Sequence, residues 1–175
     1  MSTFVRLVLL AAVLLAAGCR QPPPAPAGDA SAATVASNRP FAERVAGPDA
    51  SDFDDARRGL IARPQGQVLG PDGVALIDFD AFEFVAGEAP PTANPSLWRH
   101  AQLNAEIGLY KVTDGIHQLR GFDIANMTLI DSNSGWIVVD PLTSTESARA
   151  ALAFARQHLG DKPVAAIIFT HSHID

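Results

Sequence analysis

Residues 171–175 read His-Ser-His-Ile-Asp, and of all segments in this chain they hold the side chains best suited to binding a metal ion. The three polar ligands alternate with other residues, so in an extended or turning segment they can converge on one side. Two imidazoles and a carboxylate suit borderline divalent metals, above all zinc. The segment follows the apolar run 164–170, and sites in α/β sheets usually lie at the carboxyl ends of strands. The pattern therefore predicts metal ligands at His171, His173 and Asp175.

A His-x-His pair also occurs by chance in proteins that bind no metal, and this is the alternative interpretation. The apolar run directly before it and the aspartate two residues after it favour the metal interpretation. The other histidines are poor ligand candidates. His100 lies in an expected amphipathic helix, His117 in an expected strand, and His158 in the last turn of an expected helix, where a cation favours the helix dipole.

The single cysteine, Cys19, excludes an internal disulfide and lies in a leader-like segment. One positive charge precedes the apolar run Leu7–Ala17, which is shorter than the roughly 20 residues that a bilayer-spanning helix needs. These features are typical of a secretory signal. The run ends in Leu-Ala-Ala-Gly-Cys and resembles a bacterial lipobox, which predicts a lipoprotein signal over residues 1–18 and lipidation of Cys19. An ordinary signal peptide with an incidental cysteine is the alternative.

Residues 19–40 are rich in proline and alanine and predict a disordered tether, because such a composition buries too little apolar surface to order itself. A proline-rich ligand for a partner domain is the sharper alternative. Residues 41–93 form an expected N-terminal extension, with a helix near Ser51–Ile61 and a hairpin over residues 67–80 that turns at Asp-Gly.

From residue 94 the pattern becomes regular and predicts the start of a mixed α/β domain. Asn94 is expected to cap a helix that ends near Gly108. A second helix is expected to begin with a capping box from Thr143 to Glu146. The last strand is apolar enough to be buried and central. Strands are expected at residues 109–112, 116–120, 126–131, 136–140 and 164–170.

The charge balance of the chain is acidic, with 13 Lys+Arg against 19 Asp+Glu and a net charge of −6. An acidic balance argues against nucleic acid as a partner. The apolar content of 47% excludes disorder throughout the chain.

Residues 171–175 resemble the signature of the metallo-β-lactamase superfamily, His-x-His-x-Asp-His. Residues 94–112 and 121–143 are similar to the linear alkyl/aryl sulfatase branch of that superfamily. The resemblance implies an αββα sandwich with two zinc ions, the first bound by His171 and His173 and the second by Asp175. Asp140 then serves either as a structural acid near the site or as a turn residue at a strand end.

The resemblance further implies hydrolysis of alkyl sulfate esters by a periplasmic protein that forms a homodimer at full length. The lipobox adds a membrane anchor. Three ligands are too few for two zinc ions, since each needs about four. We therefore expect residues 1–175 to be the N-terminal half of the sandwich, truncated and inactive alone. Another hydrolase of the superfamily and a non-enzymatic zinc-binding lipoprotein are the alternatives.

Overall fold

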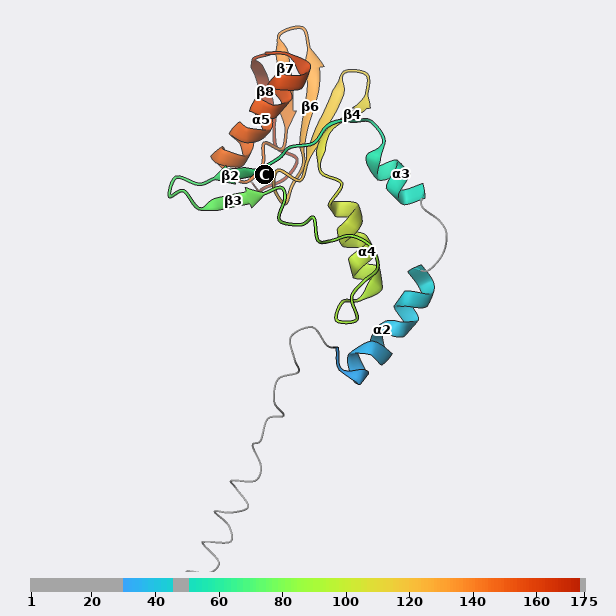
Figure 1. Ribbon diagram of the computed structural model, residues 1–175. Coiled ribbons are helices and arrows are strands. Elements are labelled where there is room, and N and C mark those ends of the chain that lie inside the picture. Colours follow the sequence, from blue (N-terminus) through green and yellow to red (C-terminus); the bar gives the residue numbers. More distant parts are fainter. Residues whose placement is uncertain (1–29, 46–50, 174–175) are drawn as a thin grey trace, which may run out of the picture.

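The computed structural model describes residues 30–45 and 51–173 (Figure 1). Cys19, the expected signal and Asp175 lie outside these ranges. No helix within them is long and apolar enough to cross a membrane. The helices are α2 (Ala32–Val45), α3 (Ser51–Arg57), α4 (Pro95–Asn104) and α5 (Thr145–Leu159). The strands are β1 (Leu60–Ala62), β2 (Gln67–Leu69), β3 (Ala75–Asp78), β4 (Gly108–Thr113), β5 (Ile116–Arg120), β6 (Met127–Ser132), β7 (Gly135–Val139) and β8 (Val164–Ile168).

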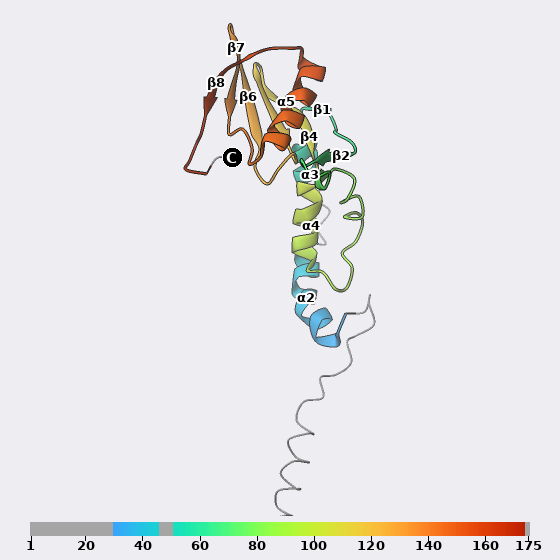
Figure 2. The ribbon, with the colours of Figure 1, turned by 90° about the vertical axis from the view of Figure 1, so that its left-hand side faces the viewer.

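Six strands form one sheet in the order β1-β4-β5-β6-β7-β8. Neighbours run antiparallel from β1 to β7, whereas β8 pairs with β7 in parallel. A parallel pair needs a crossover connection, which α5 supplies while it lies on one side of the sheet (Figure 2). The predicted mixed α/β class is confirmed.

The hydrophobic core lies between α5 and the sheet. Alternate residues of the strands point to the same face, so one set from each strand meets the helix. On α5, Ala151 and Ala155 are fully buried, and their small size lets the helix approach the strands closely. The buried core residues are Leu109, Leu119, Phe122, Met127, Leu129, Trp136, Val138, Leu142, Ala151 and Ala155.

Two local sequence predictions are confirmed. Asn94 caps α4, because its side-chain oxygen accepts hydrogen bonds from the backbone N–H groups of Ser96 at 3.0 Å and Leu97 at 3.3 Å. The hairpin expected over residues 67–80 is the antiparallel pair β2 and β3.

Helix α3 is shorter than predicted, since it ends at Arg57 rather than near Ile61. The chain turns at Gly59, where φ is +76°. A side chain at this position would lie 2.1 Å from the carbonyl oxygen of Lys111, so only glycine fits. The turn directs the next residues into β1, which joins the expected N-terminal extension to the sheet beside β4.

Helix α2 begins inside the segment that the composition predicted to be a tether. From Ala32 onward the chain is helical instead of disordered. Most of its side chains are exposed, which agrees with the small apolar surface that this composition offers. The helix is tied to the chain before α4 by the amide of Asn38, which donates to the carbonyl oxygen of Ala93 at 3.0 Å.

The prediction of a buried, central last strand is wrong for the described residues. Strand β8 lies at the edge of the sheet, and Ile167 and Ile168 are 52% and 48% exposed. The physical reason is that β8 pairs only with β7 here, and Figure 2 shows α5 on just one side of the sheet. An exposed apolar edge of this kind favours pairing with further chain.

Truncation of the core residue Leu129 to alanine should destabilise the fold by about 2–5 kcal/mol, since Leu129 is fully buried in the centre of the sheet. Ile124→Ala is the matched control, because Ile124 is 94% exposed and its truncation should change the stability by less than about 0.5 kcal/mol. Urea unfolding of the protein expressed from its native gene measures the free energy of unfolding of both variants. Equal losses in the two variants would contradict this packing.

Candidate metal centre

The site forms where β7 and β8 end side by side. Because the two strands are parallel, their carboxyl ends lie at the same edge of the sheet. The backbone ladder continues one residue beyond β7, since the N–H of Asp140 donates to the carbonyl oxygen of Ile168 at 2.9 Å. This places Asp140 opposite the segment that leads into Thr170 and His171.

The carboxylate of Asp140 holds Thr170 through two hydrogen bonds. The backbone N–H of Thr170 donates to Oδ1 at 2.9 Å, and its hydroxyl donates to Oδ2 at 2.7 Å. These two bonds hold the pKa of Asp140 below its usual value, and the nearby His171 acts in the same direction. The two roles considered for Asp140 therefore coincide, because one carboxylate fixes the turn and positions the residue before His171.

The contact between Thr170 and His171 selects a tautomer of the imidazole. The Thr170 hydroxyl has one hydrogen, which it gives to the ionised Asp140, so its oxygen must accept a hydrogen bond from Nδ1 of His171 at 3.0 Å. Nδ1 then carries the proton, and Nε2 carries the lone pair that a metal needs. This tautomer is inferred from the hydrogen-bond network.

The two predicted histidine ligands lie together. Nε2 of His171 and Nδ1 of His173 are 3.0 Å apart, and both side chains are exposed at the sheet edge. Two nitrogens that each bind one tetrahedral zinc ion at about 2.0–2.1 Å lie about 3.3 Å apart. The donor pair therefore fits zinc with a shift of a few tenths of an ångström.

Other candidate ligands are either outside the described residues or far from this pair. Asp175 belongs to the first group. Within residues 30–45 and 51–173, no three His, Cys, Asp or Glu side chains are grouped so that they could hold a metal ion. His100 and His158 are exposed on α4 and α5, and His158 stacks on Phe154.

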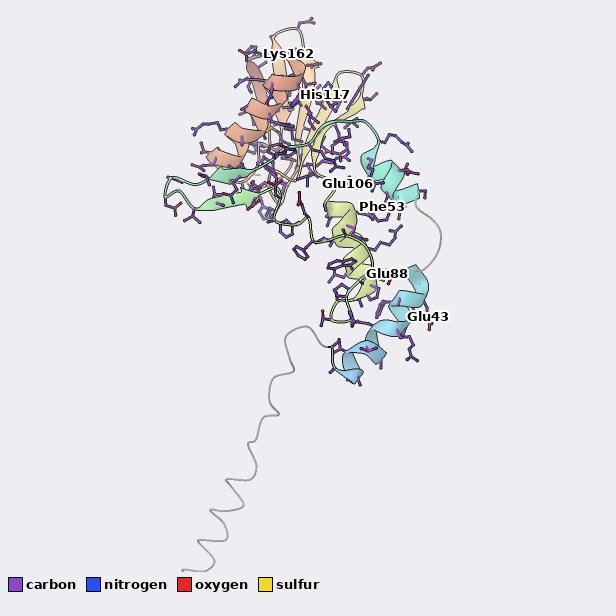
Figure 3. All side chains as sticks on the ribbon, in the orientation of Figure 1. Glu43, Phe53, Glu88, Glu106, His117 and Lys162 are labelled. Atoms are coloured by element: carbon purple, nitrogen blue, oxygen red, sulfur yellow. The ribbon has the colours of Figure 1, made fainter. Side chains whose placement is uncertain are left out.

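His117 lies within the sheet on β5, separated from β8 by two strands (Figure 3). Its Nδ1 is buried without a hydrogen-bond partner among the described atoms. Burial lowers the pKa of His117. The positive charges of Lys111 and Lys162 also lower it, whereas the negative charge of Asp131 raises it by less than the total lowering. The neutral form of this imidazole is therefore favoured, and the strands β6 and β7 separate His117 from the histidine pair.

A second carboxylate, Asp123, secures the turn after Asp140. Its Oδ2 accepts hydrogen bonds from the backbone N–H of Thr143 at 2.9 Å and from the Thr143 hydroxyl at 2.5 Å. Burial alone would raise the pKa of Asp123, but the hydrogen bonds from Thr143 and from the N–H of Ile124 outweigh it and lower the pKa.

The predicted capping box is wrong because of this contact. Thr143 turns its hydroxyl toward Asp123, and Ser144 caps α5 instead, accepting from the N–H of Ser147 at 3.0 Å. The roles of Asp123 and of the Thr170 hydroxyl were not predicted from the sequence. Asp123 lies shortly after β5 in a stretch that resembles the sulfatases, and Thr170 ends the apolar run 164–170, but neither position alone indicates a hydrogen-bonding role.

Comparison with known proteins gives the class of this chain. Residues 120–175 match the metallo-beta-lactamase superfamily. The structure also aligns with that of the stereoselective inverting sec-alkylsulfatase Pisa1 from Pseudomonas sp., with a TM-score of 0.79, 44% identity, and coverage of 83% of this chain and 23% of that chain. The chain belongs to the metallo-β-lactamase superfamily, and within it to the alkylsulfatase branch, as its motifs predicted.

Two curated relatives agree. The chain is 42% identical over 183 residues to an (R)-specific secondary-alkylsulfatase from Pseudomonas sp., an alignment that covers 100% of this chain and 28% of the relative. It is 43% identical over 144 residues to the alkyl/aryl-sulfatase BDS1 of Saccharomyces cerevisiae, covering 81% of this chain and 22% of that protein. The chain thus spans about a quarter of the length of these relatives.

Substitution of Asp123 by asparagine should destabilise the protein by about 1 kcal/mol at pH 7, because it removes the charge from the hydrogen bonds to Thr143. The folded-state pKa is depressed below 3.8, so this contribution is present above pH 3.8 and is lost as the pH falls through the folded-state pKa. Thermal unfolding at pH 7 and pH 3 measures the difference between wild type and variant. That difference should shrink in acid.

Asp161→Asn is the control, since the Asp161 side chain is 88% exposed and forms an ion pair with the partly exposed Arg156. We expect a change of less than about 0.5 kcal/mol. A difference between wild type and Asp123→Asn that stays constant from pH 7 to pH 3 would contradict the role assigned to the Asp123 carboxylate.

Proposed function

We propose that this chain contributes the metal-binding edge of a hydrolase that cleaves alkyl sulfate esters. One observation carries the proposal: the chain brings Nε2 of His171 and Nδ1 of His173 to 3.0 Å at the carboxyl end of β8. Its similarity to alkylsulfatases over most of its length supports the substrate class.

The proposed metal is zinc, with His171 and His173 on a first ion and Asp175 on a second. Zinc ions would supply Lewis acidity toward the ester and acidify a water molecule at neutral pH. The residues of this chain orient the ligands. Asp140 holds the Thr170 hydroxyl, whose oxygen accepts a hydrogen bond from Nδ1–H of His171 and leaves Nε2 turned toward His173.

The remaining zinc ligands and the groups that bind the sulfate are proposed to lie in sequence that corresponds to the rest of the relatives. Two zinc ions need about eight ligands between them, and His171, His173 and Asp175 are three. We therefore propose that residues 1–175 alone hydrolyse alkyl sulfates at a negligible rate, and that the complete protein acts as a homodimer.

The proposed location is the periplasm of a bacterial cell, with a lipid on Cys19 as the membrane anchor. A lone cysteine after an apolar segment of this length and a Leu-Ala-Ala-Gly sequence supports this proposal. An anchored enzyme would meet detergent-like esters where they partition into the membrane surface.

Replacement of His171 or His173 by alanine should abolish zinc binding at the first ion and lower alkyl sulfate hydrolysis by more than about a hundredfold, because even partners of metal ligands cost 10–100-fold. His100→Ala is the matched control, since His100 is exposed on α4 and should leave both quantities within about twofold. Elemental analysis and a sulfate-release assay on the natively expressed protein measure them. Full zinc content in both His171 and His173 variants would refute the assignment.

Replacement of Cys19 by serine should remove the lipid attachment point, since serine cannot form the thioether. The protein should then shift from the membrane fraction to the soluble periplasmic fraction, with unchanged hydrolysis of alkyl sulfates per molecule. Fractionation with metabolic labelling by radioactive palmitate tests this. An unlabelled wild-type protein would favour an ordinary signal peptide.

A further inference from the structure

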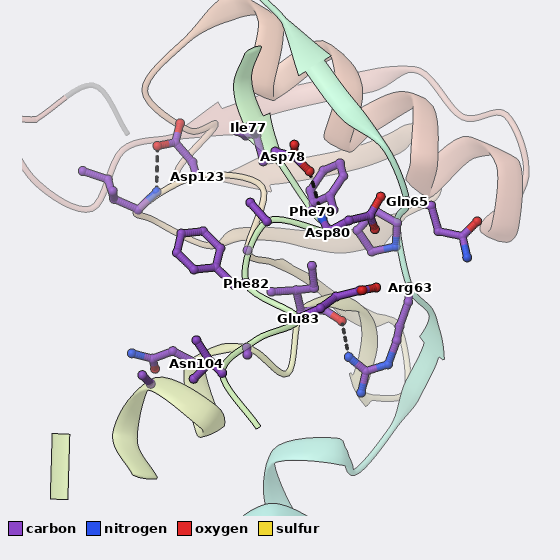
Figure 4. Close-up of a pocket in the computed structure, with 18 of the residues that line it drawn as sticks. Arg63, Gln65, Ile77, Asp78, Phe79, Asp80, Phe82, Glu83, Asn104 and Asp123 are labelled. Carbon is purple, nitrogen blue, oxygen red and sulfur yellow. Dashed lines mark hydrogen bonds between the residues drawn. The ribbon is translucent and has the colours of Figure 1, made fainter. Parts of the chain in front are cut away.

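The structure contains a cavity of about 760 Å³, whose lining residues Figure 4 shows. Three parts of the chain line it: the segment after β1 with the β3 strand and residues 79–85, the end of α4 with residues 105–107, and the loop after β5. The volume falls within the 300–1,000 Å³ that is typical of small-molecule sites. The chemistry of its lining decides which molecule it suits.

The lining is largely apolar, and several of its apolar side chains are exposed. Leu76 is 50% exposed, Phe82 63% and Ile124 94%. Apolar surface in contact with water is unfavourable, at roughly 25 cal/mol per Å², and gathered surface of this kind usually marks an interaction site. An apolar occupant of the cavity would remove these three side chains from water together.

The charged groups of the lining exclude an anion as the occupant. Asp78, Asp80, Glu83 and Asp123 line the cavity, and Arg63, the one basic side chain among the described lining residues, is bound to Glu106. A sulfate group placed among these carboxylates would be repelled by each of them. An uncharged chain meets no such repulsion, so the cavity favours the apolar part of an amphiphile over its anionic part.

The cavity and the metal centre lie at the same edge of the sheet. Strands β5, β7 and β8 run in the same direction, because β5 and β7 each lie antiparallel to β6, and β7 is parallel to β8. The loop after β5, which lines the cavity, therefore lies at the edge that carries His171. Asp123 in this loop lines the cavity and accepts two hydrogen bonds from Thr143, in the turn that follows Asp140.

We propose that this cavity binds the alkyl chain of the sulfate ester, and that Phe82 and Ile124 on its rim determine the preferred chain length. The inference rests on the proposed function and adds to it the place of the chain. The ester lies with its chain among Leu76, Phe82 and Ile124 and its sulfate beyond Asp123, toward His171 and His173.

The test is a chain-length series from butyl to decyl sulfate, below micelle-forming concentrations, on the natively expressed protein. Wild type should gain about fourfold in affinity for each methylene that enters the cavity. Phe82→Ala should weaken the binding of decyl sulfate about five- to tenfold and leave butyl sulfate within twofold.

Phe84→Ala is the matched control, since Phe84 is also exposed, lies 6.4 Å from Phe82 between ring centroids, and does not line the cavity. It should leave the whole series within twofold. A second pair of variants distinguishes filling of the cavity from a general effect on folding. Ala101→Phe fills the cavity from α4, so the gain in affinity with chain length should stop at shorter chains. Ala153→Phe, on the exposed face of α5, should leave the chain-length profile unchanged.

Two readouts separate this inference from the proposed function. Calorimetric binding to the zinc-free protein measures chain recognition without hydrolysis, and sulfate release from the zinc-loaded protein measures catalysis. Hydrolysis by wild type with equal chain-length profiles for Phe82→Ala and Phe84→Ala would overturn the cavity assignment and leave the function intact. Chain-dependent binding that Phe82→Ala weakens, without any sulfate release, would overturn the function and leave the cavity assignment intact.

Discussion

The hydrogen bonds between the Asp140 carboxylate and Thr170 are the contact on which the candidate metal centre depends. They join the carboxyl ends of β7 and β8 at a point where the backbone ladder has ended. The same hydroxyl then fixes the protonated nitrogen of His171. Without the carboxylate, the Thr170 hydroxyl would be free to donate its hydrogen to His171, and the preference for a lone pair at Nε2 would be lost.

This contact is made possible by backbone strain in the turn after β7. Asp140 and Leu142 have positive φ values of 52° and 72°, which are uncommon for residues other than glycine. Each left-handed residue costs about 1–2 kcal/mol. Hydrogen bonds to a charged group contribute about 1.5–3 kcal/mol each, so the two from Thr143 to Asp123 are large enough to offset the strain. Burial of the Leu142 side chain, which is 3% exposed, also stabilises this turn.

The sequence predicted the parts of the fold that follow from local pattern. Apolar runs marked β4 to β8, and Asn94 marked the start of α4. Each of these rests on residues within a few positions of one another. His171 and His173 were found for the same reason, because a spacing of two places both on one side of a short segment.

The errors occur where a distant residue decides the local structure. Thr143 and Glu146 fit a capping box, but Asp123, 20 residues earlier, takes the hydroxyl of Thr143. The apolar run of β8 matches a central strand, yet its place at the edge depends on which strands pair with it. Asp123 itself has no local signature, since its role arises only when the turn after β7 folds against the loop after β5.

The charges around the site explain why the anionic and apolar ends of an ester would be separated. Five side chains at this edge are those of Asp123, Asp140, Thr170, His171 and His173, and two of these five are carboxylates whose pKa values are lowered. A sulfate group would approach such an edge only if cations were bound there, and imidazole nitrogens such as those of His171 and His173 are groups that bind them. The carboxylates of the neighbouring cavity repel the same sulfate group, whereas the apolar side chains of that cavity favour contact with the alkyl chain. Metal ions at the histidines and carboxylates in the cavity would therefore orient an alkyl sulfate in one direction.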